Sequence, residues 1–446
     1  MMSESWPENK YTLDDACHFI VDSEHKTAPM QDEGFPLIRT PNIGPGYFIM
    51  NGVKCVSEAT YQDWTRRGQP QAGDLILARE APVGNVAMVK PGMAVCLGQR
   101  TVLIRPDSSL VEPSYLTYLL LGDEVQGHFA AVANGATIHH LNLKDLRSMV
   151  LPTLPNLKTQ RKIAGVLSAY DDLIENNTRR IALLEEMTQA LYREWFVEFR
   201  FPGHETAEFV EDEQGRRPMG WEQVRVAEVA LVHRGRSYKR ENLVVEGGQP
   251  FINLKCIERD GGFRLDGVKR YEGPLKPSQT AVAGDIVMGV TDMTQERRIV
   301  ARAARVPRLS GEAAVSMDLV KIVPRRDVAN AYLYGMFRFS DFADEVKQHA
   351  NGANVLHLSP ERITTFEFTL APTVFRDQYA ALAEGLYAEI DVLSLRNANL
   401  RHTRDLLLPR LISGELDVSD LDVRLSGEAT SSSYVAEDDQ LEQATA

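Results

Sequence analysis

The chain has 446 residues, enough for about two or three domains of ordinary size. Its 43% hydrophobic and 25% charged residues are typical of a globular protein with a sizeable core, and no run of about eighteen apolar residues predicts a membrane span. The formal net charge of −13 neither suggests nor excludes a nucleic-acid partner, because nine acidic residues and one basic residue lie between Glu415 and the C-terminus.

The cysteines and the N-terminus bear on the cellular location. Neither a zinc site nor a disulfide framework is indicated by the cysteine spacing, so we expect no bound metal and a reducing, cytoplasmic location. The N-terminal stretch MMSESWPENKYTLDD lacks the basic start and apolar run of a signal peptide. The four cysteines lie far apart, at Cys17, Cys55, Cys96 and Cys256.

The first two segments are a globular domain and a long helix. Residues 1–155 contain short β-branched runs such as LILA and TVLIR, separated by turn signals, which predicts a compact α/β or β-rich domain. Residues 156–202 follow Pro155 and carry an unbroken heptad, which predicts a helix packed against another helix. The seam consists of Ile163, Leu167, Tyr170, Ile174, Asn177, Ile181, Leu184, Thr188, Leu191 and Trp195.

The same pair of segments then recurs. Residues 203–372 again contain β-branched runs, IVMGV and LVKIV among them, and residues 373–413 again carry a heptad. Residues 414–446 are acidic and predict a disordered, solvated tail. The second seam consists of Tyr379, Leu382, Leu386, Ile390, Leu393, Asn397, Leu400, Arg404, Leu407 and Leu411.

Both long helices are expected to act as spacers. About 40 residues at a rise of ~1.5 Å each give a rod of roughly 60 Å, longer than an ordinary domain requires. Asn177 and Asn397 lie near the middle of their seams, where a polar residue fixes the helix register at some cost in stability. Helices that merely complete a core are the alternative interpretation.

An internal repeat runs through most of the chain. ANGATIHHL (133–141) is echoed by ANGANVLHL (350–358), PLIRTPNI (36–43) by PFINLKCI (250–257), and GDLILAR (73–79) by GDIVMGV (284–290). All matches occur in the same order at offsets of 211 to 217 residues. Such an ordered series indicates duplication of one unit.

The plan and the wording resemble a known family. Residues 135–177, GATIHHLNLKDLRSMVLPTLPNLKTQRKIAGVLSAYDDLIENN, and residues 406–422, LLLPRLISGELDVSDLD, are similar to junction and closing motifs of the specificity subunit of type I restriction-modification systems. The resemblance covers about residues 10–422. The second junction departs from it, because APTVFRDQ stands where the first has LPNLKTQR.

The resemblance implies an α/β (α+β) fold with two target-recognition domains that alternate with two long antiparallel coiled-coil helices in a pseudo-two-fold repeat. It implies a non-catalytic subunit whose two domains each read one half of a bipartite, non-palindromic site in double-stranded DNA. Partners would be two modification subunits, which hold S-adenosylmethionine and methylate adenine, and restriction subunits. No cofactor is expected on this chain and no membrane contact. The repeated text then marks scaffold, and the differing text marks specificity.

Candidate DNA contacts lie in polar segments between strands. Arginine and glutamine offer donors for guanine or adenine edges or for phosphates, and acidic groups accept from cytosine. A solvated surface residue is an equally good interpretation of any single arginine. For His140 and His357, which the repeat shares, a buried histidine that holds the junction is at least as good an interpretation. The candidates are Arg39, Asn42, Arg79, Glu80, Gln99, Arg100, His140, Asn253, Lys255, Thr291, Asp292, Thr294, Gln295, Arg297, Arg298 and His357.

Two other classes of function remain open. A self-contained adenine methyltransferase would carry an asparagine or aspartate followed by two prolines and an aromatic residue, and a glycine-rich cofactor loop, and the sequence shows neither. A nuclease is harder to exclude, because its acidic and lysine residues have loose spacing. The mildly acidic body also leaves open a scaffolding protein that joins partners through its helices without touching DNA.

Overall fold

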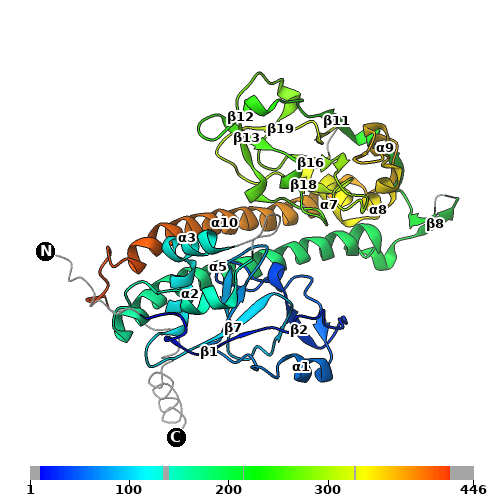
Figure 1. The fold of residues 1–446 in the computed structure, drawn as a ribbon. Coiled ribbons are helices and arrows are strands. Elements are labelled where there is room, and N and C mark those ends of the chain that lie inside the picture. Colours follow the sequence, from blue (N-terminus) through cyan, green and yellow to red (C-terminus); the bar gives the residue numbers. More distant parts are fainter. Residues whose placement is uncertain (1–10, 134–139, 214, 326–327, 422–446) are drawn as a thin grey trace, which may run out of the picture. The chain divides into compact units, whose positions relative to one another are not determined.

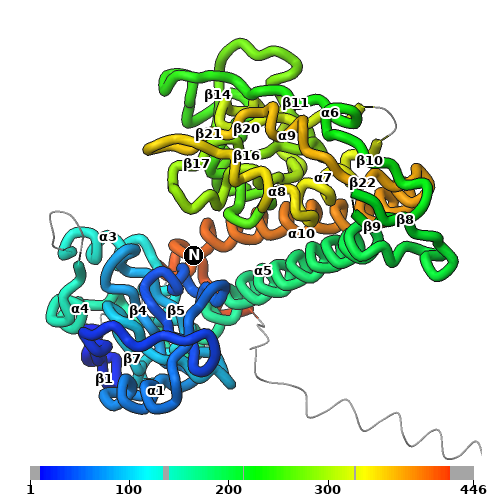
Figure 2. Tube along the Cα trace, turned by 90° about the vertical axis from the view of Figure 1, so that its right-hand side faces the viewer, coloured from blue at the N-terminus to red at the C-terminus, as the bar shows by residue number. Residues whose placement is uncertain are grey.

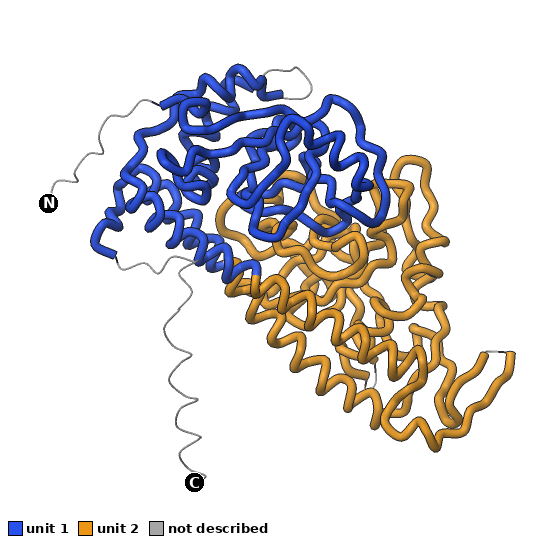
Figure 3. The backbone as a smooth tube through the Cα atoms, turned by 90° about the horizontal axis from the view of Figure 1, so that it is seen from below, with its two compact units in different colours: residues 1–175, 399–446 blue, residues 176–398 orange. Residues whose placement is uncertain are grey.

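The fold is taken from a computed structural model, which describes residues 11–133, 140–213, 215–325 and 328–421. It divides into two compact units (Figure 3). Unit 1 comprises residues 1–175 and 399–446, and unit 2 comprises residues 176–398. Two long helices, α5 (Leu157–Tyr192) and α10 (Thr373–Ile412), each contribute one part to either unit.

Unit 1 contains two small sheets (Figure 1). The larger has the order β1-β7-β4-β5 with antiparallel neighbours throughout. The smaller has the order β3-β2-β6, where β2 is antiparallel to β3 and parallel to β6. The strands are β1 (Cys17–Asp22), β2 (Phe35–Ile38), β3 (Cys55–Val56), β4 (Leu75–Ala78), β5 (Val86–Met88), β6 (Cys96–Leu97) and β7 (Thr101–Pro106).

Strand β4 explains how the layers of unit 1 pack. Its four residues, LILA, are all buried, because the strand is covered on both faces. Leu75 and Leu77 join a core with helix α2, whereas Ile76 packs with Ile38 and Leu97 of the small sheet. This alternation is the period of two expected for a strand. The helices of this unit are α1 (Glu58–Trp64), α2 (Pro113–Leu121), α3 (Asp123–Val132) and α4 (Leu143–Ser148).

Unit 2 repeats this topology. Its sheet β11-β20-β16-β18 is again antiparallel throughout, and in its sheet β12-β14-β13-β19-β15 strand β13 is antiparallel to β14 and parallel to β19. The repeated phrases GDLILAR and GDIVMGV lie on the corresponding strands β4 and β16. These strands are β11 (Ala230–Arg234), β12 (Leu243–Val244), β13 (Gln249–Ile252), β14 (Lys269–Tyr271), β15 (Thr280–Ala281), β16 (Ile286–Gly289), β18 (Ala303–Arg305), β19 (Ala313–Val315) and β20 (Leu319–Pro324).

The rest of unit 2 comprises short helices, three strand pairs and an aromatic core. Tyr192, at the end of α5, packs with Phe196, Tyr332 and Tyr379. Strand β17 pairs with β21 beside the main sheet (Figure 2). These elements are β8 (Phe209–Asp212) with β9 (Gly215–Pro218), β10 (Glu222–Arg225) with β22 (Glu367–Leu370), β17 (Thr291–Asp292) with β21 (Leu356–His357), α6 (Val226–Val229), α7 (Asn330–Phe339), α8 (Phe342–Val346) and α9 (Pro360–Thr364).

Helices α5 and α10 contact each other inside each unit. In unit 2 the Asn177 side-chain amide donates to Asn397 Oδ1 over 3.0 Å, and Arg180 pairs with Glu389 at 2.8 Å. Rising numbers on α5 therefore meet falling numbers on α10, so the helices run antiparallel there. In unit 1 Arg404 pairs with Asp171 at 2.5 Å.

One seam residue was predicted wrongly. Leu382 is 53% exposed, and its neighbour Ala383 is fully buried instead. The buried positions at this end of α10 are Tyr379, Ala380, Ala383 and Tyr387, because they face the aromatic core of unit 2. The ten seam residues of the first helix, of which Ile163 is the first and Trp195 the last, are all at least partly buried, as predicted. No helix of the described ranges is long and apolar enough to cross a membrane.

Candidate functional site

The turn between β6 and β7 of unit 1 lies where the two sheets meet. Gly98 N–H donates to Ile38 O at 2.8 Å, and the buried Thr101 hydroxyl donates back to Gly98 O at 2.7 Å. Added at Gly98, a Cβ would come within 2.8 Å of Ile38 O, so the close approach requires glycine. The backbone thus fixes this turn and leaves the side chains of Gln99 and Arg100 to the surface.

Arg79, which directly follows β4, is buried behind this turn and hydrogen-bonds to it. Its side chain is 7% exposed; its Nε donates to Leu141 O at 2.7 Å and its Nη1 pairs with Asp22 of β1. Arg79 N–H donates to Arg100 O at 3.0 Å. Three segments that are distant in the sequence are therefore tied together by one buried guanidinium.

His140 connects Arg79 to Glu80. Its Nε2 lies 2.6 Å from Arg79 Nη2, and its Nδ1 lies 2.7 Å from Glu80 Oε1. Because a guanidinium can only donate, Nε2 must accept, and the network assigns the proton to Nδ1, which donates to Glu80. The described part of the repeated phrase, from His140 onward, thus holds the site together. Residues 134–139, which include Asn134, Gly135 and Ala136, lie outside the described residues.

Arg100 carries the exposed charge of this network. Its Nη1 pairs with Glu80 Oε2 at 2.7 Å, where Glu80 is 11% exposed and Arg100 is 50% exposed. The backbone of Arg100 has φ +69°, in the left-handed region that is uncommon for a residue other than glycine. Beside it, the Gln99 side-chain amide donates to His25 O at 3.4 Å. A buried carboxylate thus holds one exposed guanidinium at the end of the turn.

Arg39 and Asn42 flank the same turn. Arg39 is half-buried and packs its side chain over Gly98. Asn42 is 6% exposed, accepts from Arg39 N–H at 3.2 Å and donates to Ile49 O at 3.3 Å, so its amide shapes its own loop. The structure brings together six of the unit 1 candidates: Arg39, Arg79, Glu80, Gln99, Arg100 and His140. The seventh, Asn42, stabilises the neighbouring loop.

Unit 2 builds the corresponding turn with different chemistry. Ser316 N–H donates to Ile252 O at 2.9 Å and Val290 N–H donates to Asp318 O at 3.0 Å, repeating the bonds of Gly98 and Arg79. Asp318 therefore corresponds to Arg100, and the apolar Val290 to Arg79. The Asp318 carboxylate accepts from the Ser316 hydroxyl at 3.2 Å, and Met317 beside it is 50% exposed.

Sequence reasoning missed Asp318, as it missed Asp22 of unit 1. Asp318 could have been found by placing TVLIR over LVKIV and comparing the residue that precedes each run. Nothing in the sequence indicates that Asp22 pairs with Arg79, because 57 residues separate the two.

The predicted contact segment of unit 2, residues 291–298, forms a separate loop. Asp292 is 1% exposed and accepts from Thr294 N–H at 2.9 Å and from Ile299 N–H at 2.8 Å. Burial raises the pKa of the Asp292 carboxyl, but the hydrogen bonds from Ile299 and Thr294 outweigh it and hold this pKa below its usual value. Asp292 therefore organises the loop from inside it.

The side chains on this loop differ in exposure. Thr291 is buried and pairs with His357, which is exposed, across β17 and β21. The Gln295 amide donates to Ala353 O at 3.1 Å, and Arg297, with φ +53°, donates to Gln348 at 3.4 Å. Thr294 and Arg298 are also exposed on this loop.

Asn253 and Lys255 occupy the places that the repeat predicts. Arg39 and Asn253 each precede a short 3-10 helix, Thr40–Asn42 and Leu254–Cys256 respectively. Asn253 is buried and donates to Gly267 O at 2.7 Å, whereas Lys255 is exposed. Only Lys255 of this pair therefore presents a polar group to a ligand.

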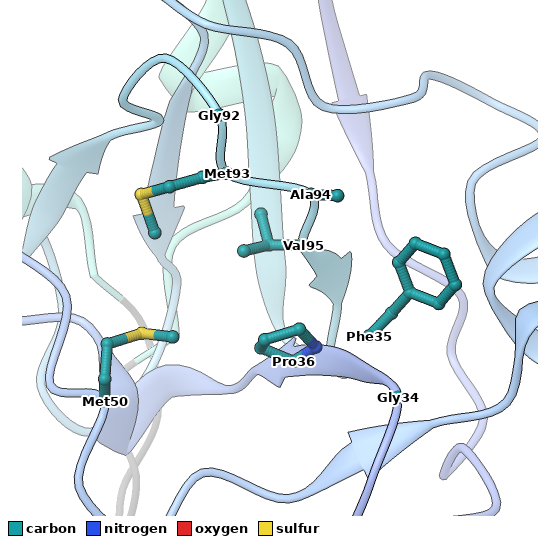
Figure 4. A pocket seen from close by; sticks show the side chains of 8 residues that line it. All are labelled: Gly34, Phe35, Pro36, Met50, Gly92, Met93, Ala94 and Val95. Carbon is teal, nitrogen blue, oxygen red and sulfur yellow. The ribbon is translucent and has the colours of Figure 1, made fainter.

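Neither an apolar hollow nor a cluster of metal-binding side chains adds another site among the described residues. The hollow in unit 1 is lined by side chains such as Phe35, Met50 and Val95 and offers no charged group (Figure 4). Among the described residues, no three histidine, cysteine, aspartate or glutamate side chains are placed to hold a metal ion. Each of the two turns offers a hydrogen-bonding side chain for recognition. The side chain is positively charged in unit 1, at Arg100, and negatively charged in unit 2, at Asp318.

Comparisons with known proteins agree on one family. Residues 10–186 match the model described as the type I restriction modification DNA specificity domain. The chain is 24% identical over 381 residues to the type I restriction enzyme MjaIX specificity subunit of Methanocaldococcus jannaschii, covering 84% of each chain. It is 23% identical over 378 residues to the HindI specificity subunit of Haemophilus influenzae, covering 71% of this chain and 80% of that one.

A solved structure shares the fold. The crystal structure of the type I restriction-modification system S subunit from M. genitalium matches with a TM-score of 0.56 at 14% identity, covering 92% of this chain and 97% of that chain. The mixed helix and strand architecture is therefore that of a known protein over nearly its whole length.

Proposed function

Since this chain carries the type I restriction modification DNA specificity domain at residues 10–186, we propose that it is the DNA-recognition subunit of a type I restriction-modification complex. Each unit reads one half of a bipartite target in double-stranded DNA. The chain itself carries out no catalysis; adenine methylation belongs to two modification subunits that hold S-adenosylmethionine, and cleavage to restriction subunits.

One observation carries the proposal of two different half-sites. The same pair of sheets occurs in both units, yet the turn at their junction presents Arg100 in one and Asp318 in the other. A duplicated framework with divergent polar groups suits a non-palindromic target, whereas a homodimer would read the same half-site twice. A scaffolding protein without DNA contact would have no use for such matched, opposite groups.

The long helices supply the spacer in this proposal. The antiparallel contacts of α5 and α10 in unit 2, with the buried pair Asn177 and Asn397, support a coiled coil in which the asparagines fix register. We propose that the pair relates the two units by a pseudo-two-fold axis, separates the half-sites by a fixed length and docks the modification subunits.

The candidate contacts divide by exposure. Exposed or half-exposed groups such as Arg100, Gln99, Lys255, Gln295 and Arg298 are proposed to touch DNA. Side chains engaged within the fold position them; these are Asn42, Arg79, Glu80, Asn253, Thr291 and Asp292. Phosphate contacts would set orientation and base contacts would set the sequence.

Mapping methylated adenines in cells that express this chain with its modification subunits tests the proposal. A bipartite motif is expected, and replacing residues 1–155 with another recognition domain should change one half of it only. A change of both halves together would contradict the assignment of one half-site to each unit. Methyl transfer by the purified chain without a partner would contradict its non-catalytic role.

A further inference from the structure

The residue that ends the turn before β7 or β20 occupies the same place in both units. Arg100 O accepts from Arg79 N–H, and Asp318 O accepts from Val290 N–H, each at 3.0 Å. The next residue is held equally in both: Ser23 N–H donates to Thr101 O at 3.0 Å, and Gly235 N–H to Leu319 O at 3.1 Å. These backbone hydrogen bonds are thus the same in both units, although the left-handed φ of +69° at Arg100 has no counterpart at Asp318, and the side chains differ.

Arg100 is built to present a guanidinium in one orientation. The partly exposed side chain is tethered through Nη1 to Glu80, and Glu80 is itself held by His140. Among the described residues no other group bonds the Arg100 guanidinium, so Nη2 and Nε remain available as donors. Two donors on a fixed planar fork match the O6 and N7 acceptors of guanine.

Arg100 differs from an ordinary surface arginine because Glu80 holds its guanidinium in one orientation. Arg66, in the turn that follows α1, is also exposed and pairs with Asp63 at 3.1 Å, but that carboxylate is itself 52% exposed and lies three residues away. Glu80 is nearly buried and belongs to a network that crosses the unit. Burying a carboxylate costs free energy, and an incidental ion pair on the surface forms without that cost.

Asp318 presents the complementary chemistry. Its half-buried carboxylate accepts from the Ser316 hydroxyl, and within the described ranges no cation pairs with it. A carboxylate is repelled by phosphate, so on a DNA-binding surface it suits a base edge that donates. The cytosine N4 amino group is such a donor.

We propose that this turn residue sets one base pair in each half-site: Arg100 reads guanine in the half-site of unit 1, and Asp318 reads cytosine in the half-site of unit 2. The inference rests on the proposed function and adds the bases to it. It also implies that each half-site contains at least one G·C pair that depends on a single side chain.

Methylation mapping with point variants in the full complex tests the inference. Arg100→Lys keeps the positive charge and removes the planar fork, and Asp318→Ala removes the acceptor. Each variant should lower discrimination at one G·C position of its own half-site by roughly tenfold or more, and leave the other half-site unchanged. The unchanged half also shows that the variant folds and binds. Matched controls are Arg66→Lys and Asp260→Ala, both at exposed positions of the same units.

The outcomes separate this inference from the proposed function. If the unaltered complex methylates a bipartite motif but Arg100→Lys leaves every position as selective as before, the inference is wrong and the proposed function stands. Loosening of an A·T position, or of several positions in both half-sites, also overturns it. If the unaltered complex shows no sequence motif, the proposed function fails and the inference falls with it.

Discussion

Asn177 and Asn397 are joined by a hydrogen bond of 3.0 Å, and both are nearly buried between α5 and α10. The Asn397 amide donates in turn to the Thr178 hydroxyl at 3.2 Å. Two polar side chains at the centre of a mostly apolar seam form this hydrogen bond only when the helices keep this register. Sliding either helix by one turn would bury both amides against apolar side chains.

Replacing one of these asparagines should destabilise the protein more than replacing both. Asn177→Leu removes the amide that donates to the nearly buried Asn397 Oδ1, and the loss of such a bond costs about 1 to 3 kcal/mol of unfolding free energy. With Asn397→Leu added, both buried amides are replaced by leucine side chains and most of that loss should be recovered. Thermal unfolding of the two single variants and the double variant measures the coupling. A double variant whose loss equals the sum of the single losses would show that the pair is not coupled.

Lengthening the helix should change the gap between half-sites. Four residues inserted between Asn177 and Ile181 add roughly 6 Å of helix, about two base-pair steps of ~3.4 Å. The insertion turns the helix by about 400°, which a heptad seam accommodates as a stutter. Methylation mapping should show both half-sites retained and the spacer altered.

The control for this insertion is the same four residues placed at Val245, which is 95% exposed in a turn of unit 2. There the spacer should stay as it is. An unchanged spacer with the helix insertion, in a protein that remains folded and active, would mean that the helices only dock partners.

Removing the Arg79 guanidinium should destabilise unit 1 strongly. Arg79→Met takes the guanidinium from the nearly buried Asp22 carboxylate, which keeps the His25 imidazole at 3.4 Å, and removes the donor to Leu141 O, so a loss of about 3 kcal/mol is expected. Arg66→Met removes an exposed pair and should cost less than about 1 kcal/mol. Urea unfolding of both variants checks the difference. Equal losses would show that the buried network contributes nothing beyond a surface pair.

Acid should weaken unit 2 through Asp292. Because the folded pKa of this carboxyl lies below its usual value, its contribution is fully present above about pH 4 and is lost as the pH falls through the depressed folded pKa. Asp292→Asn should therefore lower the melting temperature at pH 7. The gap between the variant and the unaltered protein should narrow below about pH 4. A gap that stays constant between pH 7 and pH 3 would contradict the assignment.

The repeat was the most informative property of the sequence. Its offsets align Asn253 with Arg39. Both residues directly follow corresponding strands, β13 and β2, and each precedes a short 3-10 helix. The long helices could be predicted because a heptad depends only on local spacing. Leu382 was misplaced because the aromatic core of unit 2, which selects Ala383, is assembled from segments far apart in the chain.

The site was predicted less well than the fold. Arg79 has the sequence context of an exposed loop arginine, yet it is buried because Asp22, His140 and Leu141 converge on it. Such convergence depends on tertiary structure that no spacing rule contains. Asp318 differs in this respect: the order of the repeats places it opposite Arg100, but residues 291–298 are richer in polar side chains and are therefore the stronger candidate by composition.

The turn that carries Gln99 and Arg100 has a consequence for how such a protein changes over generations. Its shape depends on backbone bonds, on Gly98 and on Thr101, and not on the two side chains that it displays. A single codon change at either displayed position therefore alters what the surface offers without rebuilding the fold. Under the proposed function, a point mutation there would change the group that faces the DNA, and the unit 2 turn, with Met317 and Asp318, is an example of how far the two displayed residues can diverge.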